Sequence, residues 1–127
     1  MKLIYVAGKY NGKDPIEIKE NILKAERVAL ECWRKGWAVI CPHKNTGGFE
    51  IYEGEQFISW NTWMDGDLEM VGRCDAIVMV DNWVFSQGAR MELNHAQQLK
   101  KEVFMSVDDV EKLNKIKYIA NLEDKEE

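Results

Sequence analysis

The sequence predicts an α/β fold, a three-layer sandwich in which a parallel sheet of four or five strands lies between helices. Short apolar runs typical of buried strands alternate along the chain with longer segments whose apolar residues recur at helical spacing. This alternation favours parallel strands joined by right-handed helical crossovers. The length of 127 residues suits one domain. We expect that domain to cover residues 1–121, followed by a charged tail at residues 122–127.

The first strand and the first helix occupy the N-terminal third of the chain. The apolar run KLIYVAG ends at Gly8 and predicts a buried strand. After the loop KYNGKDP, Asp14 is the expected N-cap of a helix that has Pro15 at its first position. Gly36 is expected to end this helix. The apolar stripe of the helix comprises Ile18, Ile22, Ala25, Ala29, Cys32 and Trp33.

A second strand and a second helix follow, separated by a long loop. WAVICP, residues 37–42, predicts the strand, and HKNTGGFEIYEGE, residues 43–55, predicts a polar loop with two glycines. In a small domain such a loop is often functional. The second helix is expected from about Gln56 to Arg73. Its expected core face comprises Phe57, Trp60, Met64, Leu68 and Val71.

The third strand is expected at the centre of the sheet. DAIVMV, residues 75–80, is apolar throughout, as in strands covered on both faces. The loop DNWVFSQ leads to a helix that ends at about Lys101. VFMSV, residues 103–107, predicts a fourth strand, and DDVEKLNK, residues 108–115, a short helix. KYIA, residues 117–120, is a candidate fifth strand.

Composition restricts the classes of function. The chain has 46% hydrophobic and 31% charged residues, as in soluble globular proteins, and contains no apolar run long enough to span a membrane. The net charge of −5 argues against polymeric nucleic acid as a partner, although it allows a small anionic ligand. Three cysteines without CxxC spacing indicate reduced thiols in a cytoplasmic protein. Two histidines argue against a zinc site, and we expect no metal and no cofactor.

The candidate pocket lies at one edge of the predicted sheet. Ligands of parallel sheets bind beyond the carboxyl ends of the strands, where the loops GKYNG, PHKNTGG and DNWVFSQG are expected. Tyr5 lies near the end of the first strand, and the N–H groups of Gly8 and Gly12 could approach an anion. Ser86 and the first N–H groups of the next helix, including that of Gly88, form a second candidate anion site.

Two carboxylates fall on faces that are expected to be buried. Glu92 shares a helical stripe with Ala89, Ala96 and Leu99, and Asp67 lies on or near the buried side of the second helix. An ionised carboxylate in apolar surroundings is unfavourable unless it has partners. Catalytic sites use such burial to tune the pKa of a carboxyl group. The pattern therefore makes both residues candidates for catalysis.

Each candidate also has a purely structural explanation. Glu92 could be a cap or part of a buried ion pair, and Asp67 could pair with Arg73 or a neighbouring lysine. Tyr5 could be a core aromatic residue, and Ser86 could serve only as a helix cap. These alternatives remain open at the level of single residues.

His43 and Trp83 lie in predicted loops and have the same ambiguity. His43 could contact a ligand or only hydrogen-bond its own loop. Trp83 could stack on a base at the pocket edge or belong to the core. Both are kept as candidate substrate-binding residues.

Taken together, three motifs resemble the nucleoside 2-deoxyribosyltransferase superfamily. IYVAG resembles the first strand of that family, and SQGARMELNHA resembles its S/D-x-G-x-x-x-E-x-x-x-A motif. DLEMVGRCDAIVMV matches its pattern of an Asp, here Asp67, eight residues before a second Asp, here Asp75. The resemblance covers about residues 3–105. GEQFISWNTWMDGDLEMV is similar to the 2'-deoxynucleoside 5'-monophosphate N-glycosidases, and WAVICPHKNT to short, often phage-borne members.

The resemblance implies a flavodoxin-like, Rossmann-like fold and a catalytic role for three residues. Glu92 would be the nucleophile that attacks the anomeric carbon and forms a glycosyl-enzyme intermediate. Asp67 would be the general acid/base, and the hydroxyl of Tyr5 would orient the Glu92 carboxylate. The family also implies a small nucleoside or nucleotide substrate and a homo-oligomer, a dimer or larger, because its members borrow a residue from a neighbouring subunit.

The position of Ser86 favours a nucleotide over a nucleoside. The transferases have an Asp six residues before the nucleophile, whereas this chain has Ser86, like the nucleotide hydrolases in which a serine binds the 5'-phosphate. An uncharged hydroxyl tolerates a phosphate that an Asp would repel. Lys9 and Asn11 would add phosphate donors.

A second class of function is kept beside the enzyme. A non-catalytic nucleotide-binding module on the same fold could use the carboxylates to bind ribose hydroxyls. The presence of all three catalytic residue types favours the enzyme. A flavodoxin-like electron carrier is disfavoured, because no run of Ser or Thr follows the first strand. The sequence leaves open which base is bound and whether water or a second base accepts the sugar.

Overall fold

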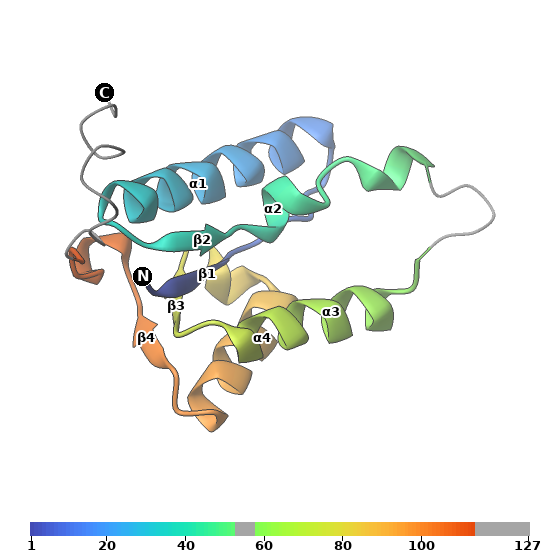
Figure 1. Ribbon diagram of the computed structural model, residues 1–127. Coiled ribbons are helices and arrows are strands. Elements are labelled where there is room, and N and C mark those ends of the chain that lie inside the picture. The colour runs from blue at the N-terminus through green and yellow to red at the C-terminus, as the bar shows by residue number, and fades with distance from the viewer. Residues whose placement is uncertain (53–57, 114–127) are drawn as a thin grey trace, which may run out of the picture.

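The computed structural model describes residues 1–52 and 58–113, and it contains a four-stranded parallel sheet with helices on both faces (Figure 1). The strand order is β2-β1-β3-β4. All three strand pairings are parallel, which confirms the predicted α/β fold of flavodoxin-like type. The strands are β1 (Leu3–Ala7), β2 (Ala38–Ile40), β3 (Ala76–Met79) and β4 (Glu102–Phe104). The candidate fifth strand at 117–120 lies outside the described residues.

The two faces of the sheet have separate cores. Helix α1 (Pro15–Arg34) covers one face, and helices α3 (Trp60–Arg73) and α4 (Gln87–Gln98) cover the other (Figure 1). Because side chains alternate along a strand, Ile4 packs on the α1 side while Tyr5 packs on the side of α3 and α4. All four residues of β3 are buried, as expected for a central strand. The alternation thus directs the Tyr5 hydroxyl toward the helices that carry the two candidate carboxylates.

The first helix begins and ends where the sequence predicts. Asp14 is the N-cap, and its Oδ1 accepts a hydrogen bond from the Glu17 N–H at 2.8 Å. Pro15 is the first helical residue, where its missing N–H has no consequence. After the helix, Gly36 has a φ of +93°, a conformation that favours glycine.

The predicted loop at 43–55 is wrong in part, because its described residues form two short helical segments. These are α2 (Pro42–Asn45) and the 3₁₀ helix η1 (Phe49–Tyr52). Pro42 was expected to end a strand, but its fixed φ also suits the first position of a helix, and the chain turns there. Gly48, with a φ of +86°, separates the two segments.

Three apolar residues expected in the core are exposed instead. Helix α3 begins at Trp60 and not at Gln56, because Ser59 Oγ accepts the Thr62 N–H at 3.2 Å and caps the helix. Trp60 therefore lies in the first turn and is half exposed. Trp33 follows the buried Cys32 by one residue, a rotation of about 100° that takes it out of the stripe. Leu99 is exposed because α4 has already ended at Gln98. The expected core residue Phe57 lies outside the described residues.

The expected helix at 108–115 is also wrong over its described part. Ser106 Oγ accepts the Asp108 N–H at 3.2 Å and forms a single 3₁₀ turn, η3 (Val107–Asp109). Residues 110–113 then form no helix and cover the buried Trp37, whose Nε1 donates to the Glu111 carbonyl at 2.7 Å. The satisfied indole and the burial of Val110 favour this path over a further helical turn. No helix within residues 1–52 and 58–113 is long and apolar enough to cross a membrane.

Candidate active site

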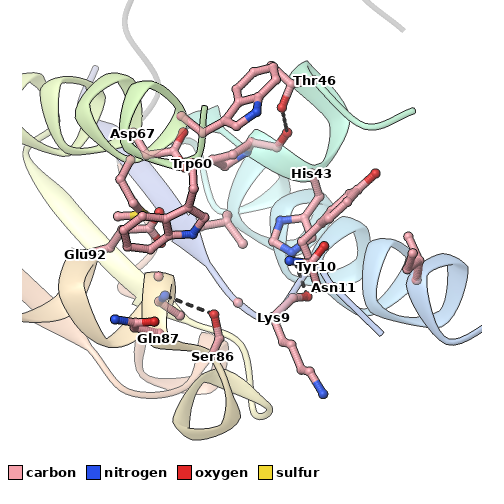
Figure 2. Close-up of a pocket in the computed structure, with 18 of the residues that line it drawn as sticks. Lys9, Tyr10, Asn11, His43, Thr46, Trp60, Asp67, Ser86, Gln87 and Glu92 are labelled. Atoms are coloured by element: carbon pink, nitrogen blue, oxygen red, sulfur yellow. Dashed lines mark hydrogen bonds between the residues drawn. The ribbon is translucent and has the colours of Figure 1, made fainter. Parts of the chain in front are cut away.

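A pocket of about 580 Å³ opens at the carboxyl edge of the sheet, where the sequence predicts one. The loop after β1, helix α2, the first turns of α3 and the N-terminus of α4 contribute to its wall (Figure 2). This volume falls within the range typical of sites for small molecules. The site is therefore formed by segments that are far apart in the sequence.

Three predicted catalytic side chains meet in the wall of this pocket. The Tyr5 hydroxyl donates a hydrogen bond of 2.8 Å to Glu92 Oε2. Tyr5 is fully buried and Glu92 is only 6% exposed. The Asp67 carboxyl forms a side-chain hydrogen bond with the Glu92 carboxyl. The structure thus brings Tyr5, Asp67 and Glu92 into one hydrogen-bonded cluster.

Burial makes ionisation of both carboxyl groups difficult. It raises the pKa of Glu92 well above its usual value, and the negative charge of Asp67 raises it further, while the Tyr5 hydrogen bond lowers it. Burial raises the pKa of Asp67 to about 6, although its hydrogen bond with Glu92 lowers it. Burial, followed by the charge of Glu92, also raises the pKa of Tyr5, so its hydroxyl stays a neutral donor. Two neighbouring carboxyl groups of this kind can share one proton at neutral pH.

The structural alternatives proposed for these carboxylates do not match the contacts. Arg73 Nε donates to Glu69 at 2.7 Å and not to Asp67. Within the described ranges, neither Asp67 nor Glu92 forms an ion pair with a Lys, Arg or His side chain. Tyr5 is both a core residue and a partner of Glu92. A buried carboxyl pair without a cationic partner is typical of a functional site more than of a stabilising ion pair.

The N-terminus of α4 forms another part of the wall. Ser86 is its N-cap, with Oγ accepting the Ala89 N–H at 3.1 Å. Ser86, Gln87 and Gly88 line the pocket, and the first N–H groups of a helix have no partner within the helix. The Ser86 hydroxyl can still donate its own hydrogen. This corner of the pocket is therefore suited to an anion, and the cap function of Ser86 coexists with that possibility.

The predicted binding residues of the loop after β1 do not all line the pocket. Gly8, Lys9 and Asn11 line the pocket, but Gly12 does not; it lies against Glu17. Lys9 Nζ lies 3.3 Å from Glu17 Oε1, and Figure 2 shows its side chain extending away from the carboxyl pair. The predicted contact of Gly12 with an anion therefore lacks support, and a ligand would have to compete with Glu17 for the Lys9 ammonium.

His43 is buried in α2 and lines the pocket. Its Nε2 lies 2.9 Å from the Lys9 carbonyl, so the loop hydrogen bond considered for it is present. Burial lowers the pKa of His43, which favours the neutral ring. If Nε2 carries the hydrogen, Nδ1 is a bare acceptor, and it has no partner among the described residues.

The predicted stacking role of Trp83 is wrong in this structure. Trp83 packs against the core formed by β1, β3, α3 and α4 and is not part of the pocket wall. Two residues further along, Phe85 is 74% exposed and lines the pocket. The short 3₁₀ helix η2 (Trp83–Phe85) rotates the two rings to opposite sides, and the sequence alone does not define this turn.

Sequence reasoning does not identify the aromatic residues of the wall. Trp60, Trp63 and Phe49 line the pocket, and the Phe49 and Trp63 rings lie 6.4 Å apart. Trp60, Trp63 and Asp67 occur at positions i, i+3 and i+7 of α3, so they share one helical face. That spacing could have identified the two tryptophans, because Asp67 was already a candidate. The further residues missed include Tyr10, Thr46, Met64 and Phe85.

The fold and the site define a flavodoxin-like α/β protein with two neighbouring carboxyl groups, one buried and one half-buried, at the carboxyl edge of its sheet. The chain belongs to the family described as Domain of unknown function (DUF4406), whose model matches residues 2–105. Among solved structures it is similar to a 2-desoxiribosyltransferase from Leishmania mexicana, with 20% identity and a TM-score of 0.54. The match covers 81% of this chain and 62% of that one, and the similarity is one of fold. No curated protein matches the sequence.

Proposed function

We propose that this protein cleaves the N-glycosidic bond of a 2'-deoxynucleoside 5'-monophosphate. The observation that carries the proposal is the hydrogen-bonded cluster of Tyr5, Glu92 and Asp67 in the wall of a pocket of suitable size. The sequence motifs that resemble deoxyribosyltransferases supply the same three residues, and the neighbouring solved structure has that activity in its name.

The reaction would proceed in two steps through a covalent intermediate. In the first, a Glu92 carboxylate oxygen attacks C1' of the sugar, the bond from C1' to the base nitrogen breaks, and Asp67 gives its proton to the leaving base. In the second, Asp67 takes a proton from water as the water oxygen attacks C1', and Glu92 leaves as a carboxylate. A second base in place of water would give deoxyribosyl transfer.

The proposed roles require the single proton of the carboxyl pair to lie on Asp67. The hydrogen bond between the two groups lowers the pKa of Asp67 and raises that of Glu92, so substrate binding must move the proton from Glu92 to Asp67. Attack requires an ionised Glu92 and a protonated Asp67, which together hold one proton. The Tyr5 hydroxyl donates to Glu92 Oε2 and so favours the ionised form of Glu92. A negative charge held beside C1' would also stabilise the oxocarbenium-like transition state.

The rest of the wall is suited to the two ends of a nucleotide. Ser86 and the N–H groups of Gln87 and Gly88 would bind the 5'-phosphate. The rings of Trp60 and Trp63 would provide apolar surface for the base. A phosphate would also draw Lys9 Nζ away from Glu17, since that ion pair is partly exposed.

A non-catalytic nucleotide-binding module is the second candidate. Two carboxyl groups with raised pKa values that hydrogen-bond each other could also donate to and accept from sugar hydroxyls. Under this alternative the protein would bind the nucleotide without turnover.

The deciding experiment is chromatography of a panel of deoxynucleotides and deoxynucleosides after incubation with the protein, with and without an added acceptor base. Free base released from a monophosphate, and lost in Glu92→Gln, would support the glycosidase and identify its substrate. A new nucleotide formed with the added base would make the enzyme a transferase. Binding without turnover across the panel would favour the binding module.

A further inference from the structure

We propose that Asn21 and Asn82 form a buried amide bridge that positions the Lys9–Asn11 wall of the pocket for ligand binding. The inference rests on the proposed nucleotide function, because it assigns the bridge to the affinity of that site. Both residues lie outside the proposed catalytic cluster, Asn21 on α1 and Asn82 three residues after the end of β3.

The bridge is a continuous chain of hydrogen bonds between three segments. Asn82 Nδ2 donates to Asn21 Oδ1 at 3.3 Å, and Asn82 Oδ1 accepts the Lys9 N–H at 3.0 Å. Asn21 Nδ2 then donates to the carbonyls of Tyr10 and Asn11, each at 3.1 Å. The two asparagines are 6% and 9% exposed, so water competes little for these groups.

The wall depends on this bridge because no helix or strand holds its backbone in place. Residues 8–12 belong to no helix or strand. Three of their backbone polar groups are satisfied by the two amides, and the Lys9 carbonyl is the partner of His43 Nε2. The bridge therefore also fixes the backbone carbonyl that orients the neighbouring His43 side chain.

Only an amide at both positions satisfies the whole chain of bonds. Each asparagine must accept through its oxygen and donate through its nitrogen. Aspartate at position 21 would place a buried negative charge against the Tyr10 and Asn11 carbonyls and could not donate to them. Aspartate at position 82 would still accept from the Lys9 N–H but would face the Asn21 oxygen without a hydrogen to give.

The close approach of the loop to Asn82 also accounts for Gly8. A methyl group at this position would lie 2.7 Å from the Val80 side chain and 3.2 Å from Asn82 Oδ1. Glycine thus allows the chain to leave β1 directly over the bridge. The Tyr5, Glu92 and Asp67 cluster packs on the other face of the sheet and shares no hydrogen bond with the bridge.

The test is the steady-state kinetics of Asn21→Asp on the deoxynucleoside monophosphate that the wild type cleaves. We expect KM to rise about tenfold, which corresponds to the loss of roughly one hydrogen bond that holds the wall in place. The kcat should stay within about threefold of the wild-type value. Asn94→Asp, an exposed change of the same kind on α4, is the matched control and should leave both constants unchanged. Asn82→Asp keeps the acceptor for the Lys9 N–H and should raise KM less than Asn21→Asp does. It replaces Asn21→Asp as the test variant if that protein does not fold. Amide hydrogen exchange at Lys9 should accelerate in Asn82→Ala.

An unchanged KM in folded Asn21→Asp and Asn82→Asp, or a loss confined to kcat, would overturn the inference. If the wild type shows no turnover, the proposed function fails separately, and the Kd for 2'-deoxynucleoside 5'-monophosphates from calorimetry replaces KM. A raised Kd in Asn21→Asp would then support the bridge. An unchanged Kd, or no binding by the wild type, would overturn it.

Discussion

The Glu92 carboxyl illustrates how a side chain suited to catalysis can oppose the stability of its own fold. Its partners are the Tyr5 hydroxyl and the Asp67 carboxyl, and it lies among apolar residues of α4 and the sheet. A neutral carboxyl is favoured there, whereas the proposed nucleophile must be ionised. The ionised form of Glu92 that the proposed reaction needs is therefore its less stable form in the folded protein.

Glu92→Gln should raise the melting temperature of the protein at neutral pH while abolishing turnover. Burial raises the pKa of Glu92 well above 4.5, so the carboxyl contributes its full stability below pH 4.5 and loses it as the pH rises through the folded-state pKa. Glutamine stays neutral and keeps the shape of the side chain. A gain of about 1 kcal/mol would correspond to roughly 3–5 °C in a domain of this size.

Thermal unfolding of both proteins between pH 4.5 and pH 8 would measure this effect. The difference in melting temperature should grow with pH and be small at the acidic end. A difference that is constant across the range, or that decreases with pH, would show that Glu92 ionises without a penalty in the folded protein.

Ser86→Asp should shift selectivity from nucleotide toward nucleoside. Repulsion between two unit charges about 4 Å apart amounts to roughly 1–4 kcal/mol near a protein surface, about tenfold or more in kcat/KM for a monophosphate. Aspartate caps helices as well as serine does, so α4 should remain intact. Ser86→Asn, a neutral cap of the same shape, is the control and should keep the preference for nucleotide. Equal selectivity in Ser86→Asp and Ser86→Asn would show that the phosphate does not bind beside Ser86.

At the scale of an element, α3 contributes both to the core and to the pocket wall along its length. Its C-terminal part buries Val71 in the core, while its first two turns place Trp60 and Trp63 in the pocket wall. Trp60 is 46% exposed, and Trp37, before β2, is fully buried. The two tryptophans therefore offer a contrast between a binding surface and a core.

Trp60→Ala should weaken substrate binding with little effect on folding. We expect KM to rise several-fold, because base stacking surface is lost, and the free energy of unfolding to fall by less than about 1 kcal/mol. Trp37→Ala should instead lose about 3–5 kcal/mol of stability. Steady-state kinetics and chemical denaturation of the two variants would distinguish the roles. A large loss of stability in Trp60→Ala with an unchanged KM would assign it to the core.

The elements that the sequence predicts well are those with a strong local signal. Periodicity places β1, α1, β3 and α4, because each buries a regular apolar face, and Asp14 defines the start of α1. It also places Glu92 inward. Short turns such as α2 and η2 depend on tertiary contacts, so residue spacing does not predict their helical geometry. For the same reason, spacing does not predict that Phe85 lines the pocket and Trp83 does not.

The carboxyl pair and the amide bridge are properties of the whole molecule. Asp67 and Glu92 are neighbours only because α3 and α4 pack side by side on the same face of the sheet. The sequence does not indicate the roles of Asn21 and Asn82, since an isolated asparagine in a helix or after a strand has no distinctive pattern. Long-range pairs of this kind require the topology before their chemistry can be recognised.

The pH dependence of turnover should report the same long-range assembly. The active form is the pair that holds one proton, so kcat/KM should fall on both sides of a maximum. Burial raises the pKa of Asp67 to about 6, which places the acidic limb near that pH. The basic limb should follow the loss of the second proton, at higher pH, because burial and the charge of Asp67 both raise the pKa of Glu92.

Tyr5→Phe should move the basic limb to higher pH and lower the maximal rate. The Tyr5 hydroxyl stabilises the ionised form of Glu92, so its removal makes the loss of the second proton of the pair harder. A phosphate on the substrate also ionises at a pKa of about 6, near the acidic limb, so the basic limb is the one that reports on Tyr5. Profiles of kcat/KM against pH for the wild type and Tyr5→Phe would measure this shift. A basic limb that stays in place would show that the hydrogen bond from β1 to α4 has no part in setting the charge of the proposed nucleophile.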